Sequence, residues 1–293
     1  MYSVGYIPVL VGGAAVFALQ GVLPWARLGA LVAAALCIIA WLNLSNDAFD
    51  AATGVDVSKP ESVVNLTGSR PLVFWSSLGF LAAGVSLLLR QIAATGDSRV
   101  TVMLALAISC GYVYQGPPFR LSYKGVGELL CFIAFGLLAT PAFFLALQPD
   151  AAAAARIAAL PTASVWALGC LVGTTTSIIL FTSHFHQIEG DRAAGKMSPL
   201  VRLGAARAYK VLVASVAGVY LATAAAAGTG LLPPVAALAT LASLPASNQL
   251  LRFAQEHHLV PARIAPLKKF ACGWHIGYGA SLAAGLLLSR GLP

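Results

Sequence analysis

Hydrophobic residues occur along this chain in long runs, separated by segments that carry polar residues, proline or glycine. A bilayer core about 30 Å thick is crossed by roughly 20 mostly apolar helical residues. Windows of that kind span residues 4–23, 28–46, 71–91, 99–115, 128–148, 163–186, 208–228, 231–250 and 271–289. The pattern predicts an all-α integral membrane protein, a bundle of nine transmembrane helices that forms a single domain over residues 1–293.

The first window is predicted to be part of the mature structure. It lacks the basic n-region of a signal peptide, and a second apolar window follows it at once. The start at "MYSVGYIPVL" has no basic lead-in, which is compatible with a short cytoplasmic segment upstream.

Composition supports a membrane protein. Of all residues, 59% are hydrophobic and 10% are charged, and the mean hydropathy is +0.83, whereas about a quarter of the residues of soluble domains are charged. All five cysteines fall inside the apolar windows without metal-ligand spacing, so we interpret them as small apolar residues rather than disulfides or metal ligands.

The basic residues orient the bundle. With nine spans, thirteen of the 18 Lys and Arg residues lie on the side of the N-terminus. The positive-inside rule then places the N-terminus in the cytoplasm and the C-terminus outside. The net charge of +8 is dispersed over short loops, which argues against nucleic acid and favours an anionic lipid surface or an anionic substrate.

Eight of the ten acidic residues lie on that cytoplasmic side, and several gather where two apolar windows end. The first segment is "NLSNDAFDAATGVD", residues 43–56, after the second window. If the helix continues through it, four polar residues share one face at i, i+3, i+4 and i+7: Asn43, Asn46, Asp47 and Asp50.

The second segment is "FTSHFHQIEGDRAAGK", residues 181–196, at the end of the sixth window. On a continuous helix His184, Gln187 and Asp191 share a face at i, i+3 and i+7. We therefore predict two polar helix faces at the cytoplasmic edge of the bundle.

These faces predict a metal site. Carboxylates at membrane depth are costly and usually face a bundle interior or a wet cavity. Mg²⁺ prefers oxygen ligands, and one or two carboxylates together with substrate phosphates commonly hold it. The predicted ligands are Asp47, Asp50 and Asp191, with Asp56, Gln187 and Glu189 as further candidates. The alternative is that these acids mark the water interface, cap a helix or carry solvated charge.

Basic residues in the same loops fit a diphosphate, because Arg offers a bidentate fork and Lys a point charge. The candidates, together with the amide of Asn46, are Lys59, Arg70, Arg120, Lys124, Arg192 and Lys196. Individually, each is also explained as a positive-inside anchor. Lys124 and Lys196 are favoured because each lies beside a glycine in a loop that carries other candidates.

A third segment, "SCGYVYQGPPFRLSYKGVGE", ends the fourth window and brings Tyr112, Tyr114 and Tyr123 to the cytoplasmic mouth. These rings either form an interfacial aromatic belt or present π faces to a carbocation and a hydroxyl to a leaving diphosphate. Our candidate catalytic residues are Asp47, Asp50, Asp191, Lys124 and Tyr114.

Together these segments resemble the UbiA superfamily of intramembrane prenyltransferases, nine-helix bundles with two Asp-rich cytoplasmic motifs, and the resemblance covers essentially the whole chain. The first family motif, N-D-x-x-D-x-x-x-D, corresponds to Asn46, Asp47 and Asp50, with Gly54 at the last position and an acid displaced to Asp56. The second, D-x-x-x-D, is represented by Gln187 and Asp191.

The stretches "NDAFDAATGVD", "SVVNLTG", "YQGPPFRLSYKGVGELLCFIAFG" and "SHFHQIEGDRAAGKMSPLVRLG" are similar to the naphthoate phytyltransferases of cyanobacterial and plastid phylloquinone synthesis. The resemblance implies Mg²⁺-dependent transfer of a phytyl group from its diphosphate to a 1,4-dihydroxy-2-naphthoate-type acceptor. The acceptor loses its carboxylate, and diphosphate is released. An inner or thylakoid membrane is implied, with the active site on the cytoplasmic face. The residues on the acceptor or second-motif side are Asn43, His184, His186 and Gln187.

Two alternatives remain open. A sister enzyme would use another polyprenyl diphosphate or another acceptor, of the menaquinone, homogentisate or 4-hydroxybenzoate type. A secondary transporter would use Asp47 and Asp50 for ion coupling, but transporters place such residues near the bilayer midplane on broken helices. Here the acids lie at one membrane edge.

Overall fold

The computed structural model describes residues 2–54, 62–149 and 161–289, and every regular element within those ranges is helical. The first half of the chain comprises α1 (Ser3–Gln20), α2 (Trp25–Thr53), α3 (Val63–Thr67), α4 (Arg70–Thr95), α5 (Ser98–Gln115), η1 (Leu121–Lys124), α6 (Gly127–Cys131), η2 (Phe132–Ala139) and α7 (Thr140–Ala146). The second half comprises α9 (Ala163–Ser183), α10 (Ile188–Ala193), α11 (Pro199–Leu203), α12 (Ala205–Gly228), α13 (Pro234–Thr240), η3 (Leu241–Ser243), α14 (Leu244–His257), α15 (Pro261–Ile264) and α16 (Leu267–Leu288).

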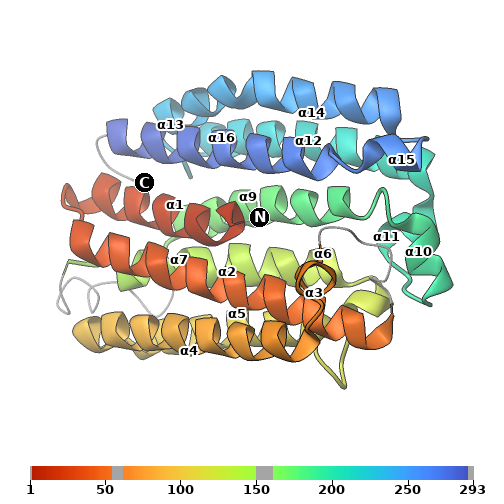
Figure 1. Ribbon diagram of the computed structural model, residues 1–293. Coiled ribbons are helices and arrows are strands. Elements are labelled where there is room, and N and C mark those ends of the chain that lie inside the picture. The colour runs from red at the N-terminus through yellow and green to blue at the C-terminus, as the bar shows by residue number, and fades with distance from the viewer. Residues whose placement is uncertain (1, 55–61, 150–160, 290–293) are drawn as a thin grey trace.

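The long helices run alongside one another, and the short helices α3, α10, α11 and α15 lie at one end of the bundle, on the right in Figure 1. Each of the nine predicted windows coincides with a helix or an unbroken succession of helices. By length and apolar composition, seven helical segments of the described chain are able to cross a membrane. Neither α5 nor the succession from α13 to α14 is among the seven, so the predicted count of nine spans is not confirmed.

The second helix extends beyond its predicted window and carries the first acidic segment. α2 continues to Thr53, where Gly54 with φ 75° ends it in the left-handed conformation that glycine adopts readily. The prediction that Asn43, Asn46, Asp47 and Asp50 lie on one helix is therefore confirmed.

The prediction of a continuous helix through the second acidic segment is wrong. α9 ends at Ser183, a turn follows, and α10 begins at Ile188. In the turn, backbone N–H groups bond three residues back, from His184 to Phe181 and from Gln187 to His184, which tightens the chain and interrupts the α-helical pattern. His184 and Asp191 therefore belong to different elements.

Hydrogen bonds join the connecting segments at this end of the bundle. The Tyr123 hydroxyl pairs with Thr53 Oγ1 at 2.8 Å, and its carbonyl accepts the N–H of Met197 at 2.9 Å. Arg202 donates to the carbonyl of Lys124 at 2.9 Å and to that of Met197 at 3.1 Å. η1 therefore holds the end of α2 and the segment after α10 in a fixed relation.

Inside the bundle, η2 and α9 cross at glycines. A Cβ at Gly136 would lie 2.6 Å from the carbonyl oxygen of Gly169 and 2.8 Å from Cα of Gly173. Such close backbone approach is typical of membrane helix pairs with small residues at the interface. The crossing fixes where α6, at the N-terminal end of η2, meets α9.

Candidate active site

The last turns of α2 form one wall of a cavity at the end of the bundle that carries the short helices. Asn43, Asn46, Asp47 and Asp50 line it. Oδ2 of Asp47 accepts the backbone N–H of Val63 at 2.8 Å, which ties α2 to the first turn of α3. Asp50 is 8% exposed, so its carboxylate is held largely out of water. The wall therefore presents two amides and two carboxylates from one helix face.

The second acidic segment contributes through the turn after α9 and through α10. Ser183, His184 and Gln187 line the cavity. Asp191 is 1% exposed, and its Oδ1 lies 3.3 Å from Nζ of Lys196, which also lines the cavity. Among the described residues, Oδ2 of Asp191 has no hydrogen-bond partner. A buried carboxylate oxygen in that state is suited to an additional cation.

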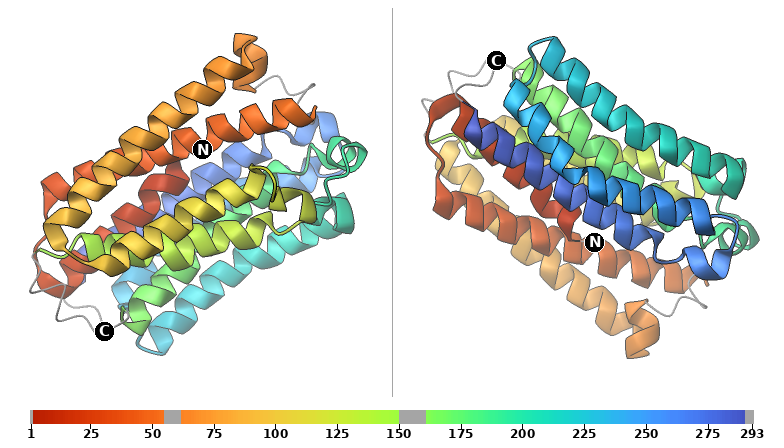
Figure 2. Two further views of the ribbon diagram at one scale, coloured as in Figure 1. Left: turned by 90° about the horizontal axis from the view of Figure 1, so that it is seen from below. Right: turned by 90° about the horizontal axis from the view of Figure 1, so that it is seen from above.

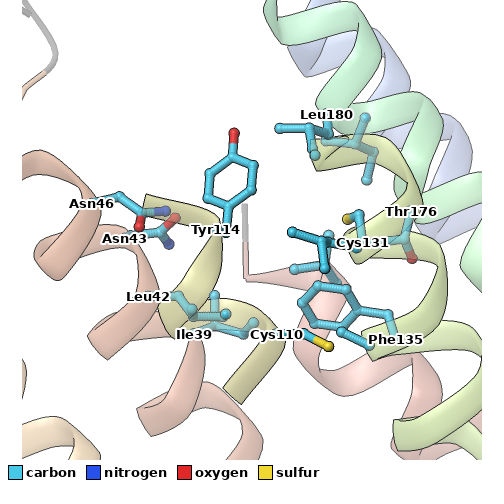
Figure 3. A pocket seen from close by; sticks show the side chains of 16 residues that line it. Ile39, Leu42, Asn43, Asn46, Cys110, Tyr114, Cys131, Phe135, Thr176 and Leu180 are labelled. Atoms are coloured by element: carbon cyan, nitrogen blue, oxygen red, sulfur yellow. The ribbon is translucent and has the colours of Figure 1, made fainter. Parts of the chain in front are cut away.

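Tyr114 of α5 stands between the two segments. The carboxylates of Asp50, Asp191 and Glu128 all lie within electrostatic reach of its phenol group. Asn43 and Asn46 project from α2 toward its ring, and its hydroxyl points away from the apolar residues around Phe135 (Figure 3). Tyr114 therefore marks the boundary between the polar cavity and an apolar region below it.

Glu128 and His184 form a pair at this boundary. Nδ1 of His184 lies 3.2 Å from Oε1 of Glu128, and the histidine side chain is 5% exposed. Glu128 lies in the first turn of α6, where the helix dipole favours a negative charge. Glu128 therefore fixes the orientation of the His184 ring beside the cavity.

The cavity holds about 660 Å³ and is adjacent to the first of two apolar voids, of about 120 Å³ and 70 Å³, which are adjacent to each other. Four residues border both the cavity and the first void: Asn43, Asn46, Tyr114 and Leu180. The first and second voids share Ile39, Leu42, Gly111, Ala134 and Phe135. A charged mouth thus leads into a narrow apolar path between α2, α5 and η2.

The far wall of the cavity comes from α16, through Lys268, Lys269, Cys272, Gly273 and Ile276. The sequence patterns did not single out the two lysines. The only sequence feature that could have pointed to them is their position just before the last apolar window, and other basic residues of the same loop lie near that window too. Glu128 was likewise missed, since one acid at the start of a window does not reveal a histidine 56 residues away.

The oxygen atoms that line the cavity suit Mg²⁺, provided that the substrate supplies further ligands. Among the described residues, no three His, Cys, Asp or Glu side chains gather closely enough to hold a metal by themselves. The available donors are carboxylate oxygens, including buried Oδ2 of Asp191, which Mg²⁺ prefers. The residues therefore fit Mg²⁺ that phosphate oxygens help to coordinate.

Several predicted site residues lie apart from the cavity lining. The side chain of Lys124 is exposed, and Nε of Arg70 donates to the carbonyl of Ala48 at 2.9 Å. Arg192 and Glu189 face each other across 3.8 Å with mostly exposed side chains.

The other predicted residues are placed as follows. Arg120 has φ 42° and its charge acts on Tyr123, while Nε2 of His186 lies 3.4 Å from Nε2 of Gln187. Asp56 and Lys59 lie outside the described residues.

Tyr123 has a raised pKa. Removal of the phenol from water is the largest cause, and the negative charges of Asp50 and Asp191 also raise the pKa, whereas the hydrogen bond with Thr53 and the charge of Arg120 lower it. Both acidic segments therefore act on the tyrosine that connects them.

Comparison with known proteins gives consistent matches. The model of the UbiA prenyltransferase family matches residues 5–270. Over 291 residues the chain is 42% identical to the chloroplastic 2-carboxy-1,4-naphthoquinone phytyltransferase of Arabidopsis thaliana, covering 99% of this chain and 75% of that protein. It is 44% identical over 288 residues to the enzyme of the same activity from Synechocystis, covering 97% of this chain and 89% of the relative.

Solved structures share the fold. A digeranylgeranylglyceryl phosphate synthase matches with a TM-score of 0.58 and 15% identity, covering 98% of this chain and 93% of that one. A UbiA homologue from Archaeoglobus fulgidus, bound to GPP and Mg²⁺, matches with a TM-score of 0.53 and 14% identity, covering 96% of this chain and 95% of that one. At such identities the likeness establishes the helical arrangement alone.

Proposed function

The chain belongs to the UbiA prenyltransferase family, and from that premise we propose that it transfers a phytyl group from phytyl diphosphate to a carboxylated naphthoquinol. The acceptor's carboxylate leaves as carbon dioxide and diphosphate is released. Support comes from the two relatives above 40% identity, whose names state phytyl transfer to 2-carboxy-1,4-naphthoquinone. The reaction belongs to phylloquinone synthesis.

The observation that carries this proposal is that the acidic cavity and the apolar voids lie next to one another and share lining residues. A prenyl diphosphate has a highly charged head and a long hydrocarbon tail. The carboxylates of Asp47, Asp50 and Asp191 lie at the charged end, and the path past Leu42 and Phe135 provides the apolar end. Tyr114 borders both the cavity and the first void, so its proposed place is where the head meets the tail, next to the bond that must break.

Asp47 and Asp50 from one side and Asp191 from the other would hold Mg²⁺. Bound there, the metal supplies Lewis-acid stabilisation of the leaving diphosphate. Lys196 orients Asp191 through their 3.3 Å contact. The apolar lining around Phe135 and Leu180 excludes water from the allylic cation, which would otherwise be hydrolysed. The electron-rich acceptor ring then attacks the cation.

The protein is a multi-pass membrane protein, and we place its acidic end in the cytoplasm. The excess of basic residues in the loops at that end supports this orientation. Phytyl diphosphate then enters with its head at the cytoplasmic surface and its tail in the bilayer. An inner or thylakoid membrane fits these substrates.

The test is product analysis by mass spectrometry. Membranes that contain the protein are incubated with dihydroxynaphthoate and either phytyl or solanesyl diphosphate. We expect phytylated naphthoquinol, formed only when Mg²⁺ is present. Asp47→Asn should lower the rate roughly 100-fold or more, while Glu256→Gln, which changes an exposed carboxylate away from the cavity, should not.

Prenylation with solanesyl but not phytyl diphosphate would contradict the proposed donor and favour a sister enzyme. Absence of product from both donors would contradict the proposed acceptor. Full activity in the presence of a chelator would contradict the metal site.

A further inference from the structure

Lys268 and Lys269 line the cavity without a counter-charge. In the part of the chain that the structure describes, neither ammonium group makes an ion pair or a hydrogen bond with a side chain. Both lie in the first turn of α16, which holds no acidic residue. Positive charge is unfavourable at that end of a helix because the dipole there is also positive. An anion beside the two lysines would compensate both charges.

The same helix face continues as an apolar strip. Cys272, Gly273 and Ile276 follow Lys268 at i+4, i+5 and i+8, and all three line the cavity. A Cβ at Gly273 would meet no atom within 4 Å, so the wall is open there. α16 therefore presents a cationic end followed by a flat, open apolar surface, which suits a planar aromatic carboxylate.

The opposite wall carries the residues that are proposed to bind the prenyl diphosphate. Asp47 and Asp50 lie on α2, and neither apolar void has a lining residue from α16. Lys196 already compensates Asp191. A diphosphate placed on the α2 side, with its tail between α2, α5 and η2, leaves the α16 wall for the second substrate.

We propose that Lys268 and Lys269 bind the carboxylate of the aromatic acceptor, with its rings against Cys272, Gly273 and Ile276. The inference rests on the proposed function and assigns the acceptor its place in the cavity. Separate cations for the two substrates keep the acceptor carboxylate away from the diphosphate, which would repel it. The two lysines thereby distinguish carboxylated acceptors from quinols that lack the carboxylate.

The experiment compares two inhibitors of product formation. 1-Hydroxy-2-naphthoate carries the carboxylate and 1-naphthol does not. In the variant Lys268→Gln/Lys269→Gln, we expect the inhibition constant of 1-hydroxy-2-naphthoate to rise roughly ten- to hundredfold, the usual range for a lost charged hydrogen bond. The KM of the acceptor should rise in parallel. The inhibition constant of 1-naphthol and the KM of phytyl diphosphate should change by less than about threefold.

Lys210→Gln is the matched control, because Lys210 is exposed in the first turns of α12 at the same end of the bundle. It should change neither inhibition constant. Lys268→Arg/Lys269→Arg should keep most of the preference for the carboxylated inhibitor, since the charge is retained. Equal amounts of folded protein in the membrane, measured for every variant, exclude a general loss of structure.

Three outcomes would overturn the inference. If the KM of phytyl diphosphate or the inhibition constant of inorganic diphosphate rises instead, the lysines bind the donor. If only the amount of protein in the membrane falls, they anchor the helix to lipid headgroups. If the inhibition constants of both inhibitors rise equally, the lysines do not contact the carboxylate. Inactivity of the unmodified protein toward dihydroxynaphthoate would instead contradict the proposed function.

Discussion

Lys196 and Asp191 form a buried ion pair beside the cavity, with Nζ 3.3 Å from Oδ1 and side chains 6% and 1% exposed. Two charges in such a place are costly to desolvate, and each depends on the other. The pair therefore places a carboxylate and its counter-charge together at the side of the cavity. Such an arrangement suits the proposed role of Asp191 as a metal ligand.

Lys196→Met should destabilise the protein by about 3–5 kcal/mol, because it leaves the Asp191 charge buried without its partner. Thermal unfolding in detergent measures the effect. The double variant Asp191→Asn/Lys196→Met should be less destabilised than the two single losses combined, by about 0.5–3 kcal/mol. Arg192→Met, in an ion pair with exposed side chains, is the control and should have little effect. Additive losses in the double variant would contradict the coupling.

At the opposite end of the bundle, Asp97 caps α5, and its carboxylate accepts side-chain hydrogen bonds from Arg99, among them bonds of 2.9 Å to Oδ1 and 2.6 Å to Oδ2. The side-chain hydrogen bonds from Arg99 are the main reason why the pKa of Asp97 is lowered. A carboxyl group with a lowered pKa stabilises the folded state above its ordinary pKa, and this contribution disappears as pH falls through the folded-state pKa.

Asp97→Ala should therefore lower the unfolding temperature at neutral pH, with a loss of about 1 kcal/mol from the helix cap alone. The difference from the unmodified protein should shrink as pH falls from the ordinary pKa of aspartate, about 4, through the lower pKa that Asp97 has in the folded protein. Below that lower pKa the Asp97 carboxyl group is protonated and no longer pairs with Arg99 as an anion. Unfolding measured across that range checks the direction. A difference that grows toward low pH would contradict the assignment.

At this scale, the sequence predicted residues that one helix brings together, and it missed those that tertiary contacts bring together. Asp47 and Asp50 share a face because α2 is regular, and helical periodicity suffices to find them. Glu128 depends on His184, 56 positions away. No local pattern links the two, because the turn after α9 and the packing of α6 decide their contact.

At the scale of elements, apolar length predicted where helices lie but not where they break. α2 continues through polar residues to Gly54, whereas α9 stops at Ser183, although both segments have polar residues at helical spacing. Within the fifth window the chain forms a π-helix, η2, which ends next to Pro141. Proline lacks an N–H and disturbs the preceding turn, which is a sequence signal for such a distortion.

The glycine crossing of η2 and α9 gives a prediction about these elements. Gly136→Ala places a methyl group against the backbone of Gly169 and Gly173, which cannot yield as a flexible side chain would. The helices must separate, and we expect a loss of about 1–3 kcal/mol. Thermal unfolding in detergent provides the measurement.

Gly79→Ala is the control for that substitution. A Cβ at Gly79 in α4 meets no atom within 4 Å, so alanine should be neutral there or slightly stabilising through its higher helix propensity. Equal effects of the two substitutions would show that helix propensity, rather than close packing, determines the stability of the crossing.

At the scale of the whole molecule, the site exists because α2, α5, α9 and α16 converge at one end of the bundle. The positive-inside pattern predicted which loops lie together at that end. It could not predict that α16 faces α2 across a cavity, since the two helices are more than 200 positions apart and only packing sets their rotation. The proposed division of the cavity into a donor side and an acceptor side therefore depends on how the bundle assembles.

The two apolar voids predict that the protein discriminates between donors by the length of the hydrocarbon tail. Ala134 borders both voids and is 7% exposed, so Ala134→Phe should fill the path beyond the first void without altering the acidic cavity. We expect phytyl diphosphate to become a poor donor, with kcat/KM lowered at least tenfold, while dimethylallyl diphosphate, whose five-carbon tail ends near Tyr114, retains its rate. Steady-state kinetics with both donors and a fixed acceptor provides the measurement. Equal losses for the short and long donors would show that the voids do not hold the tail, because only a tail that extends past Ala134 can detect the added ring.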